Sequence, residues 1–325
     1  MRKSLYLLFA AFVFFSCGEE KEEGVLSSPP FKALTDSIER SPSDAGLYYR
    51  RGVMLYGRNF PEQAEQDLRK AWQLQPEESY ALSLTTLLRQ KSTDSALTFL
   101  QQASQKLPQS IAVKIGIARA YEQKKQADQA LAICEQIIDQ YPGQLDALLL
   151  KAELLKEQNR QAEAIATLEK AYSYAPDDVE LVHTLAFDYA ESGNPKTLAL
   201  ADSLIRVDVE ASHAEPYYFK GVYYSNKGNQ AEAIRQFDAA ISHNYNFMNA
   251  HINKGIVFYE QKAYQKAAKA FELAIAISPS DADPYYWLAR AQEAMNDKAS
   301  ARLNYQRAYE LDKTMTKAAE AAKKL

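Results

Sequence analysis

Cysteine and histidine are the residues of this sequence best suited to nucleophilic or metal chemistry, and both are scarce. The chain of 325 residues has two cysteines, Cys17 and Cys134, and four histidines. None of the histidines has zinc-ligand spacing to a cysteine or to another histidine. The sequence also lacks a phosphate-binding glycine loop and the Gly-x-Ser-x-Gly and His-Glu-x-x-His patterns. We therefore expect no enzymatic activity, no metal ion and no cofactor.

Cys17 follows a short apolar segment at the start of the chain. The basic residues Arg2 and Lys3 precede an apolar run over residues 5–15, and Ser16 separates that run from Cys17. Such a run would form about 16 Å of helix, which is too short for a hydrocarbon core of about 30 Å. The segment therefore predicts a secretory signal and not a membrane span.

The residues Phe14-Phe15-Ser16-Cys17 resemble the end of a bacterial lipoprotein signal. That family prefers Leu and a small residue where Phe14 and Phe15 stand, whereas the small Ser16 fits. The resemblance implies that residues 1–16 are removed and that Cys17 is lipidated with acyl chains such as palmitate. Each buried methylene would contribute about 0.8 kcal/mol to membrane binding. The alternative is an ordinary cleaved signal that leaves a spare thiol.

An acidic run, Gly-Glu-Glu-Lys-Glu-Glu, follows at residues 18–23. It resembles the run after the lipidated cysteine in surface-exported lipoproteins of some Gram-negative bacteria, and a solvated spacer is the equal alternative. Residues 24–30 contain Gly24, two serines and Pro29-Pro30 and show no apolar periodicity. We therefore expect an acidic flexible tether over residues 17–30.

A small residue, always alanine, recurs along the rest of the chain at intervals of 32 to 37 residues. These marker alanines are Ala64, Ala96, Ala130, Ala164, Ala201, Ala233, Ala267 and Ala301. Four places after each marker stands a larger residue, at Leu68, Leu100, Cys134, Leu168, Ile205, Phe237, Phe271 and Tyr305. Most units also have Gly or Ala twelve places before the marker, at Gly52, Ala118, Ala152, Gly221, Gly255 and Ala289.

This pattern predicts pairs of antiparallel helices. Small residues let the two helix axes approach closely, and the larger residues form the stripe that meets neighbouring helices. One pair cannot bury its apolar face alone, whereas stacked pairs can. Because Cys134 takes one of the large-residue positions, we expect a buried and inert thiol. His251 also takes a core position, where we expect a packed and hydrogen-bonded ring.

The pattern resembles the tetratricopeptide repeat over residues 45–313. Segment 145–178 carries that family's spaced residues at Leu148, Ala152, Leu155, Ala164, Leu168, Ala171 and Pro176, and segment 248–281 carries them at His251, Gly255, Phe258, Ala267, Phe271, Ala274 and Pro279. The resemblance implies an all-α fold, a right-handed superhelical solenoid of about eight helix–turn–helix units. These units would be 45–78, 79–110, 111–144, 145–178, 179–213, 214–247, 248–281 and 282–313.

Three units depart from the pattern, and both ends of the array carry extra helices. Unit 79–110 is short and has Thr86 where Gly or Ala is expected. Unit 179–213 has an extra turn at residues 193–196 and lacks the closing Pro that stands at Pro176 and Pro279 in other units, and unit 214–247 has Tyr245 in place of that Pro. We expect a stacking irregularity near residues 193–213, either a bend between half-arrays or a longer surface loop. A lone helix in segment 31–44 would pack on the first unit, and a capping helix at 314–325 would cover the last.

The same resemblance places a concave groove along the first helices of the units. Residues 214–313 contain 17 aromatic residues, against 6 in residues 79–178. Seven of them, including Tyr217, Tyr224 and Tyr285, take core positions of the repeat. Tyr218, Tyr259 and Tyr286 take positions that face the groove. Tyr and Arg are common interface anchors. The predicted partner-binding groove residues are therefore Tyr218, Tyr259, Tyr286, Arg290, His183, Phe187, Asn226 and Asn249.

These features favour a protein-binding role. The formal net charge is −4, which argues against a nucleic-acid partner because phosphates require a basic surface. We expect a scaffold of the bacterial cell envelope, lipid-anchored at the outer membrane, whose partners are other envelope proteins or peptides. The alternatives are a cell-surface lipoprotein that captures a peptide or glycan, and an enzyme of unrecognised type.

Overall fold

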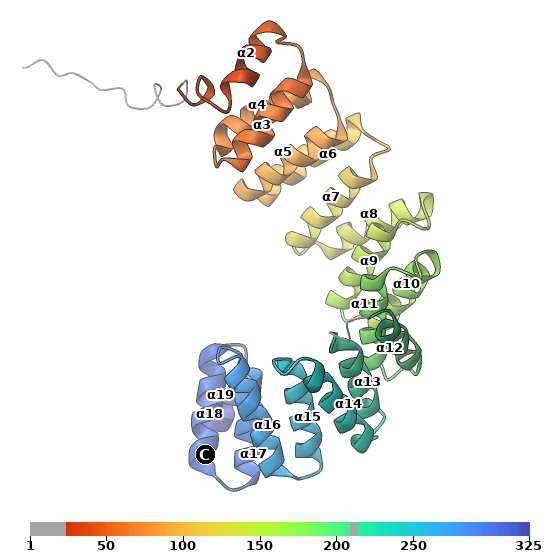
Figure 1. Cartoon of the computed structure of the whole chain (residues 1–325), viewed down its shortest axis with the longest axis vertical. Helices are drawn as coiled ribbons and strands as arrows, with labels where there is room; N and C mark the ends of the chain where they lie inside the picture. Colours follow the sequence, from red (N-terminus) through yellow and green to blue (C-terminus); the bar gives the residue numbers. More distant parts are fainter. Residues whose placement is uncertain (1–23, 209–212) are drawn as a thin grey trace, which may run out of the picture. The chain divides into compact units, whose positions relative to one another are not determined.

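The computed structural model describes residues 24–208 and 213–325, which form helices and contain no strand (Figure 1). The predicted cleavage site, Cys17 and residues 18–23 lie outside these residues. The contacts divide the chain into two compact units between Leu154 and Leu155, within helix α9 (Leu145–Glu157). They are called here the N-terminal unit and the C-terminal unit.

The helices have similar lengths and are joined by short connections. In the N-terminal unit they are α2 (Lys32–Arg40), α3 (Ala45–Gly57), α4 (Pro61–Leu74), α5 (Glu78–Lys91), α6 (Thr93–Lys106), α7 (Ile111–Gln123), α8 (Ala127–Gln140) and most of α9. In the C-terminal unit they are α10 (Gln161–Tyr174), α11 (Val179–Glu191), α12 (Lys196–Val207), α13 (Glu215–Asn226), α14 (Gln230–His243), α15 (Met248–Glu260), α16 (Tyr264–Ile277), α17 (Asp283–Ala294), α18 (Lys298–Leu311) and α19 (Thr316–Lys324).

Neighbouring helices pack as pairs, and the pairs stack on one another. In the C-terminal unit α11 packs on α12, α13 on α14, α15 on α16 and α17 on α18. The first helices of successive pairs also meet directly, α11 with α13, α13 with α15 and α15 with α17. In the N-terminal unit α3 packs on α4, α5 on α6 and α7 on α8, and the first helices α5 and α7 meet. The predicted all-α array of helix–turn–helix units is therefore confirmed.

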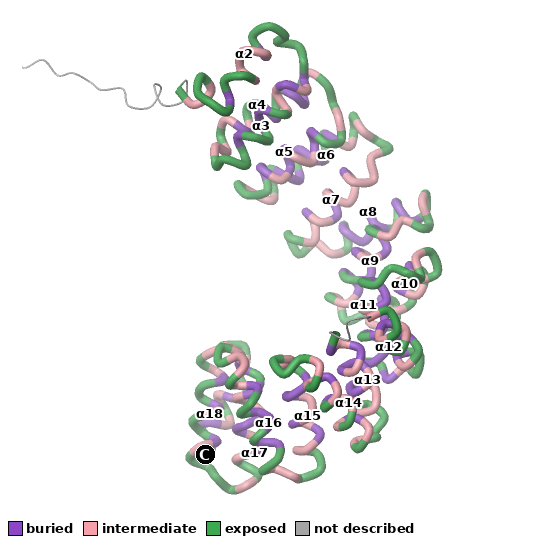
Figure 2. The backbone as a smooth tube through the Cα atoms, viewed as in Figure 1, coloured by how far each residue is buried: buried purple, intermediate pink, exposed green. Residues whose placement is uncertain are grey.

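The marker alanines lie at the contact between the two helices of each pair. All eight are buried, with at most 1% of their surface exposed. Figure 2 shows how buried residues recur along the helices. The small residue of the first helix faces the large residue of the second. At Gly255 an added Cβ would lie 2.5 Å from Cε1 of Phe271, and Gly221 meets Phe237 in the same way. Gly here provides the space that a bulky ring occupies.

Most pairs share one turn geometry between their helices. One residue of each turn has a left-handed backbone, with φ between 58° and 72°, at Asn59, Lys125, Asn159, Gly193, Gly228, Lys262 and Asn296. The next N–H then donates to the carbonyl five residues earlier, as from Ala263 to Phe258 at 2.9 Å. This bond satisfies a carbonyl that the helix end would leave free. Unit 79–110 is short because Ser92 alone joins α5 to α6.

The expected irregularity at residues 193–213 affects the connections and not the packing of the helices. Gly193 forms the same left-handed turn as the other units, and α13 packs on both α11 and α12. The side-chain amide of Asn226 donates to the carbonyls of Ala190 and Glu191 at the end of α11. These contacts favour the longer-loop alternative, with normal stacking.

One core position in this unit was predicted incorrectly. Ile205 is only half-buried, and Leu204 is buried in its place. Helix α12 begins after Pro195 and turns Thr197, Leu200 and Leu204 towards its neighbours. Spacings of three and four residues bring these side chains to one face of the helix, and Ile205 lies at the edge of that face.

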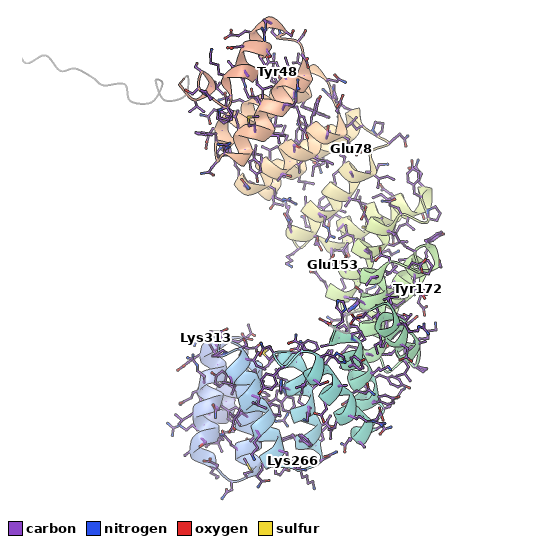
Figure 3. The ribbon with its side chains drawn as sticks, in the orientation of Figure 1. Tyr48, Glu78, Glu153, Tyr172, Lys266 and Lys313 are labelled. Atoms are coloured by element: carbon purple, nitrogen blue, oxygen red, sulfur yellow. The ribbon has the colours of Figure 1, made fainter. Side chains whose placement is uncertain are left out.

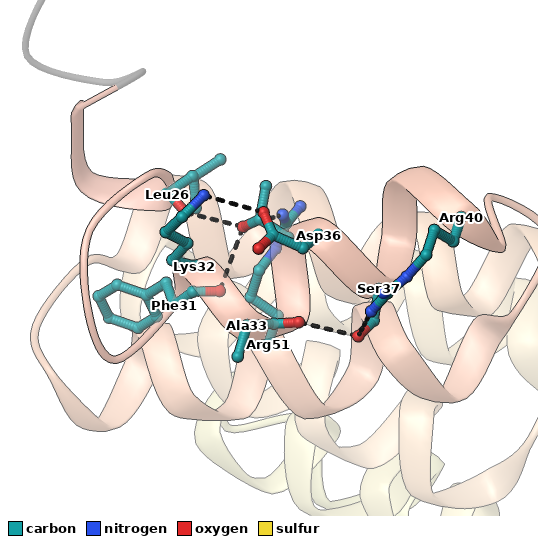
Figure 4. A network of polar contacts seen from close by, with 9 residues as sticks. Leu26, Phe31, Lys32, Ala33, Asp36, Ser37, Arg40 and Arg51 are labelled. Carbon is teal, nitrogen blue, oxygen red and sulfur yellow. Dashed lines mark hydrogen bonds and ion pairs between the residues drawn. The ribbon is translucent and has the colours of Figure 1, made fainter.

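The first described residues are folded, which corrects the prediction of a flexible tether up to Pro30. Val25 and Leu26 pack on the core of the N-terminal unit. The Thr35 hydroxyl on α2 donates to the carbonyl of Leu26 at 2.8 Å and accepts a bond from Arg51 at 2.9 Å, in the network of Figure 4. Residues 24–30 therefore belong to the folded body.

Arg51 connects this network to a buried ion pair. Its guanidinium donates to both carboxylate oxygens of Asp67 on α4, at 2.6 and 2.8 Å. Both side chains are buried, and Nη1 of Arg51 donates to the Thr35 hydroxyl. The pair therefore links α2, α3 and α4 at the start of the array. At the other end α19 packs on α18 and buries Ala318 and Ala322.

Candidate partner-binding site

The candidate site is built from the facing sides of α15 and α17. On α17, Trp287 and Tyr286 precede Arg290 by three and four residues, so the three side chains share one side of the helix. Cζ of Arg290 lies 4.6 Å from the ring centroid of Trp287, 4.9 Å from that of Tyr259 on α15, and 6.0 Å from that of Tyr286. These four residues are called the Arg290 cluster.

Buried side chains hold the rings of the Arg290 cluster in place. Trp287 stacks on Phe271, with centroids 6.2 Å apart and planes inclined by 22°. Tyr286 packs on the ring of Tyr305 at 5.7 Å, and Tyr259 meets the edge of Trp287 at 5.9 Å. Phe271 and Tyr305 are core residues, so buried side chains support the rings of the cluster from below.

Arg290 differs from the other covered arginines of the described chain. Among the described arginines Arg51 is buried, Arg119 and Arg290 are half-buried, and the others are exposed. Arg51 binds Asp67, and Arg119 binds Glu122 and Glu153. No ion pair or side-chain hydrogen bond joins Arg290 to a residue of 24–208 or 213–325. Its donors therefore remain for water or a ligand.

Other cations lie over aromatic rings without forming a comparable site. Lys266 on α16, labelled in Figure 3, has its ammonium 5.7 Å from the centroid of Phe258, but its side chain is exposed. Lys254 lies at the same distance from that ring and is paired with Asp238. Only in the Arg290 cluster do three rings surround one cation among the described residues.

A pocket of about 350 Å³ adjoins the Arg290 cluster. Tyr286 and Trp287 form one wall, and residues 314–318, before and at the start of α19, form the other. Asp283 and Lys317 bring one charge of each sign to its rim. Burial raises the pKa of the Asp283 carboxyl, and Asp281 and Asp312 raise it further. The pocket therefore offers an apolar wall beside the free guanidinium.

The structure thus brings together three of the eight predicted groove residues, Tyr259, Tyr286 and Arg290. Trp287 completes the cluster and was not predicted. Its position three residues before Arg290 could have indicated it, because that spacing brings the side chains together on a helix. Whether a partner binds at these residues stays a prediction.

Tyr218 does not lie open on the groove as predicted. It is 8% exposed, and its ring packs on Phe247 at 5.0 Å and on Phe237 at 5.9 Å. Its hydroxyl accepts a bond from the side-chain amide of Asn253 at 3.0 Å. Burial raises the pKa of Tyr218 to about 12, and Glu191 contributes to the rise.

The predicted core tyrosines show the opposite error, because Tyr217, Tyr224 and Tyr285 are only half-buried. A first helix such as α15 packs against four others: its own partner, the second helix of the preceding pair, and the first helices on either side. A large side chain between two first helices is therefore covered even where the repeat pattern assigns it to the groove.

Phe187 and His183 on α11 lie beside Tyr218 and Phe219 of α13. Phe187 is 37% exposed and stacks on Tyr218, with centroids 6.5 Å apart. The His183 ring packs against Phe219 at 5.4 Å and lies 6.5 Å from His213. Burial lowers the pKa of His183, Glu215 opposes this and His213 adds to it. Phe187 offers apolar surface, and the covered His183 ring favours the neutral state.

The two predicted asparagines have different surroundings. The Asn226 amide closes the end of α11, as described above, so its role is structural. Asn249 is exposed at the start of α15. Its backbone carbonyl accepts a bond from Asn253 at 3.1 Å. Of the two, Asn249 is the one whose side chain can reach a ligand.

Two further predictions are confirmed. Cys134 is fully buried, and burial raises the pKa of its thiol to about 12, so the thiol stays protonated at neutral pH. His251 is buried, and its Nε2 lies 2.9 Å from the carbonyl oxygen of Tyr245. Among the described residues no group of three or more His, Cys, Asp or Glu side chains could hold a metal ion.

Comparison with known families identifies the repeat. Profiles described as the tetratricopeptide repeat match residues 87–154, 123–186, 218–282 and 282–315. Together they cover more than half of the chain. The chain belongs to the tetratricopeptide repeat family.

Two curated relatives match parts of this tetratricopeptide repeat protein. A peroxisomal targeting signal receptor of Pichia angusta is 28% identical over 180 residues, which are 53% of this chain and 31% of the receptor. An uncharacterised protein of Haemophilus influenzae is 28% identical over 95 residues, 28% of this chain and 50% of that protein. The chain thus spans half or less of the length of these relatives.

Solved structures share the fold at low sequence identity. A tetratricopeptide repeat protein from Parabacteroides merdae matches 87% of this chain and 98% of its own with a TM-score of 0.57 and 14% identity. The Cut9–Hcn1 hetero-tetramer of the APC/C matches 91% of this chain and 59% of its own chain, with a TM-score of 0.53 and 14% identity. PilW, a type IV pilus biogenesis factor, matches 61% of this chain and 91% of its own chain, with a TM-score of 0.51 and 16% identity.

Proposed function

We propose that this protein is a scaffold of the bacterial cell envelope, attached to the outer membrane through lipid on Cys17, which binds a peptide segment of a partner protein. Family membership supports the scaffold role, because stacked helix pairs leave an extended face for partners. The observation that carries the proposed binding site is the Arg290 cluster, a half-buried cation among three rings with no carboxylate of its own.

The anchoring part of the proposal rests on the first seventeen residues. A basic start, an apolar run and a small residue before Cys17 resemble a lipoprotein signal, whereas Phe14 and Phe15 depart from the residues that such signals prefer. In residues 24–208 and 213–325, no helix is both long and apolar enough to cross a membrane.

Expression in a Gram-negative bacterial host with radiolabelled palmitate tests the anchor. The unaltered chain should take up the label and sediment with membranes, whereas Cys17→Ala should lose the label and leave the membrane fraction. Cys134→Ala is the matched control and should keep both properties, because that thiol is buried and protonated. Label retained by Cys17→Ala would refute lipidation at this residue.

Capture from detergent-solubilised native envelopes tests the binding site. Partner recovery should fall at least tenfold for the double variant Tyr259→Ala and Tyr286→Ala, because aromatic anchors contribute about 2 kcal/mol or more at interfaces. Tyr218 is left unchanged, since its burial would confuse binding with stability. The control is Tyr174→Ala on α10, a tyrosine that is 52% exposed. Equal recovery by the double variant and the control would place binding elsewhere.

A further inference from the structure

We propose that the N-terminal end of the array binds lipid, resting on the headgroups of the bilayer that holds Cys17 and contacting a lipid phosphate through Arg58. The surface consists of residues 24–31 with Met54, Arg58 and Phe60, and it is called here the membrane-facing surface. The inference rests on the proposed anchor at Cys17 and goes beyond it, because lipidation alone does not determine which side of the body meets the membrane.

The first step concerns the point at which the tether leaves the folded body. Gly24, the first described residue, lies in the wall of a pocket of about 580 Å³. Six residues of segment 24–31 line this pocket together with Arg58 and Phe60. Phe31 packs edge to face on Phe60, with ring centroids 5.8 Å apart. The surface from which the tether leaves is therefore hollowed and largely apolar.

The second step concerns reach. Residues 18–23 separate Cys17 from Gly24, and a chain of that length extends to at most about 20 Å. Acyl chains on Cys17 enter the hydrocarbon core, so the residue itself stays at the level of the headgroups. Such a short tether keeps the pocket next to the bilayer at a high effective concentration. Even a weak affinity of this surface for lipid is then sufficient for contact.

The third step concerns the backbone of segment 24–31. The carbonyl of Gly24 accepts a bond from the Ser28 hydroxyl at 2.7 Å, and the Ser28 carbonyl accepts the N–H of Phe31 at 2.9 Å. The carbonyl of Leu26 accepts the Thr35 hydroxyl (Figure 4). Residues 29 and 30 are both proline, which has no N–H. The segment can therefore approach an environment poor in water without losing these hydrogen bonds.

The fourth step concerns the exposed side chains. Pro29 and Pro30 are exposed, and Met54 is 36% exposed. Met54 stands four residues before Arg58, so the two side chains share one side of α3. Exposed apolar residues bounded by a charged one often mark an interaction site. At a bilayer such apolar side chains enter between the headgroups, while an arginine reaches the phosphates.

The fifth step specifies the lipid. Arg58 is exposed, and no ion pair or side-chain hydrogen bond joins it to a residue of 24–208 or 213–325. Its planar guanidinium can donate two parallel bonds to a lipid phosphate. The neighbouring run 18–23 contains four Glu and one Lys, so it attracts ammonium groups and is repelled by an anionic surface. A zwitterionic phospholipid, which carries both a phosphate and an ammonium group, matches both charges.

Chemical coupling of Cys17 to a lipid tests this surface without relying on the natural anchor. The chain lacking residues 1–16 is attached through the Cys17 thiol to a maleimide phospholipid in vesicles of phosphatidylcholine and phosphatidylethanolamine. Cys134 does not react, because its thiol is buried and protonated. Hydroxyl radicals then oxidise exposed side chains, and mass spectrometry measures the rate at each residue. Oxidation of Met54 should be slower by about threefold or more than in the uncoupled chain, since tethering gives effective concentrations in the millimolar range.

Three controls make the result specific. Arg58→Glu should lose most of the protection of Met54, because the lipid phosphate then meets a carboxylate. Lys70→Glu makes the same change of charge at an exposed residue of α4 and should keep the protection. The hydroxyl of Tyr56 accepts a bond from Gln90 on α5 at 2.7 Å, so this ring of α3 is turned away and its oxidation should not change. Thermal unfolding by circular dichroism checks that both variants are folded.

The remaining outcomes separate this inference from the proposed anchor. Equal oxidation of Met54 in the coupled and uncoupled chains, or equal protection of Met54 and Tyr56, would overturn the membrane-facing surface and leave the anchor intact. Protection that persists in Arg58→Glu, or that is stronger on phosphatidylglycerol vesicles, would overturn the assignment of the headgroup to Arg58. If the unaltered chain took up no palmitate in the host, the anchor would fail, and this surface would have no bilayer within reach.

Discussion

At the scale of single residues, the reciprocal sizes of facing side chains hold each helix pair together. Gly255 faces Phe271, whereas Ala152 and Leu168 occupy the same two positions in unit 145–178. Phe271 and Leu168 are both fully buried. Both combinations of a small and a large residue thus fill the contact between the two helices of a pair.

We predict that Gly255→Ala destabilises the protein. The new Cβ would lie 2.5 Å from Phe271, so the ring or the helix must move. Overpacking costs about 1–3 kcal/mol and outweighs the helix propensity gained, which is up to about 1 kcal/mol. Urea unfolding followed by Trp287 fluorescence should show a net loss of about 1 kcal/mol.

A compensating change is the control for this prediction. Gly255→Ala combined with Phe271→Leu reproduces the pair at Ala152 and Leu168 and should be more stable than Gly255→Ala combined with an unchanged Phe271. If the single variant matched the parent in stability, the close contact would have no energetic role.

The sequence predicted burial correctly for residues whose surroundings are the same in every repeat. It failed for residues whose burial depends on a side chain from a neighbouring pair. The marker alanines, Cys134 and His251 are buried as predicted, because they take the core positions that the repeat pattern assigns. Tyr218 was misplaced because Phe187 of the preceding pair and Asn253 of the following pair cover it. The repeat pattern contains no information about the size of such neighbours.

At the scale of elements, a buried ion pair and its hydrogen bonds join the three helices α2, α3 and α4 at the start of the array. The ion pair of Arg51 and Asp67 links α3 to α4, and Thr35 connects α2 to it. The repeat pattern did not predict this pair, because polar residues at core positions are particular to one unit. The helices themselves were predictable because Gly, Ala and Pro recur at fixed spacings.

We predict that Asp67→Ala destabilises the N-terminal unit by about 3–5 kcal/mol, because it leaves the buried charge of Arg51 without its acceptor. Trp72 on the same helix reports this unfolding by its fluorescence. The double variant Arg51→Met and Asp67→Leu removes both charges and should recover most of the loss. A loss below about 1 kcal/mol in Asp67→Ala would show that solvent screens the pair.

At the scale of the whole molecule, each helix pair depends on its neighbours in the stack. Helix α19 covers the last pair with Ala318 and Ala322, which pack in one cluster with Ala308 and Tyr305 of α18. In stacked repeats the effect of removing such a cap is confined to the nearest units.

We predict that deletion of residues 314–325 lowers hydrogen-exchange protection in α17 and α18 by at least tenfold, or about 1.4 kcal/mol. Protection in α3 to α6 should stay unchanged, and it serves as the internal control. Uniform loss of protection along the chain would show that the array unfolds as a single cooperative body instead.

The folding of residues 24–30 onto α2 limits how far the body can stand from a lipid bilayer. With acyl chains on Cys17, only residues 18–23 remain as a leash, and six residues extend to at most about 20 Å. If Cys17 is lipidated as proposed, this length would hold the first helix pair within about 20 Å of the bilayer surface. The proposed anchor would then restrict that pair to partners that reach close to the membrane.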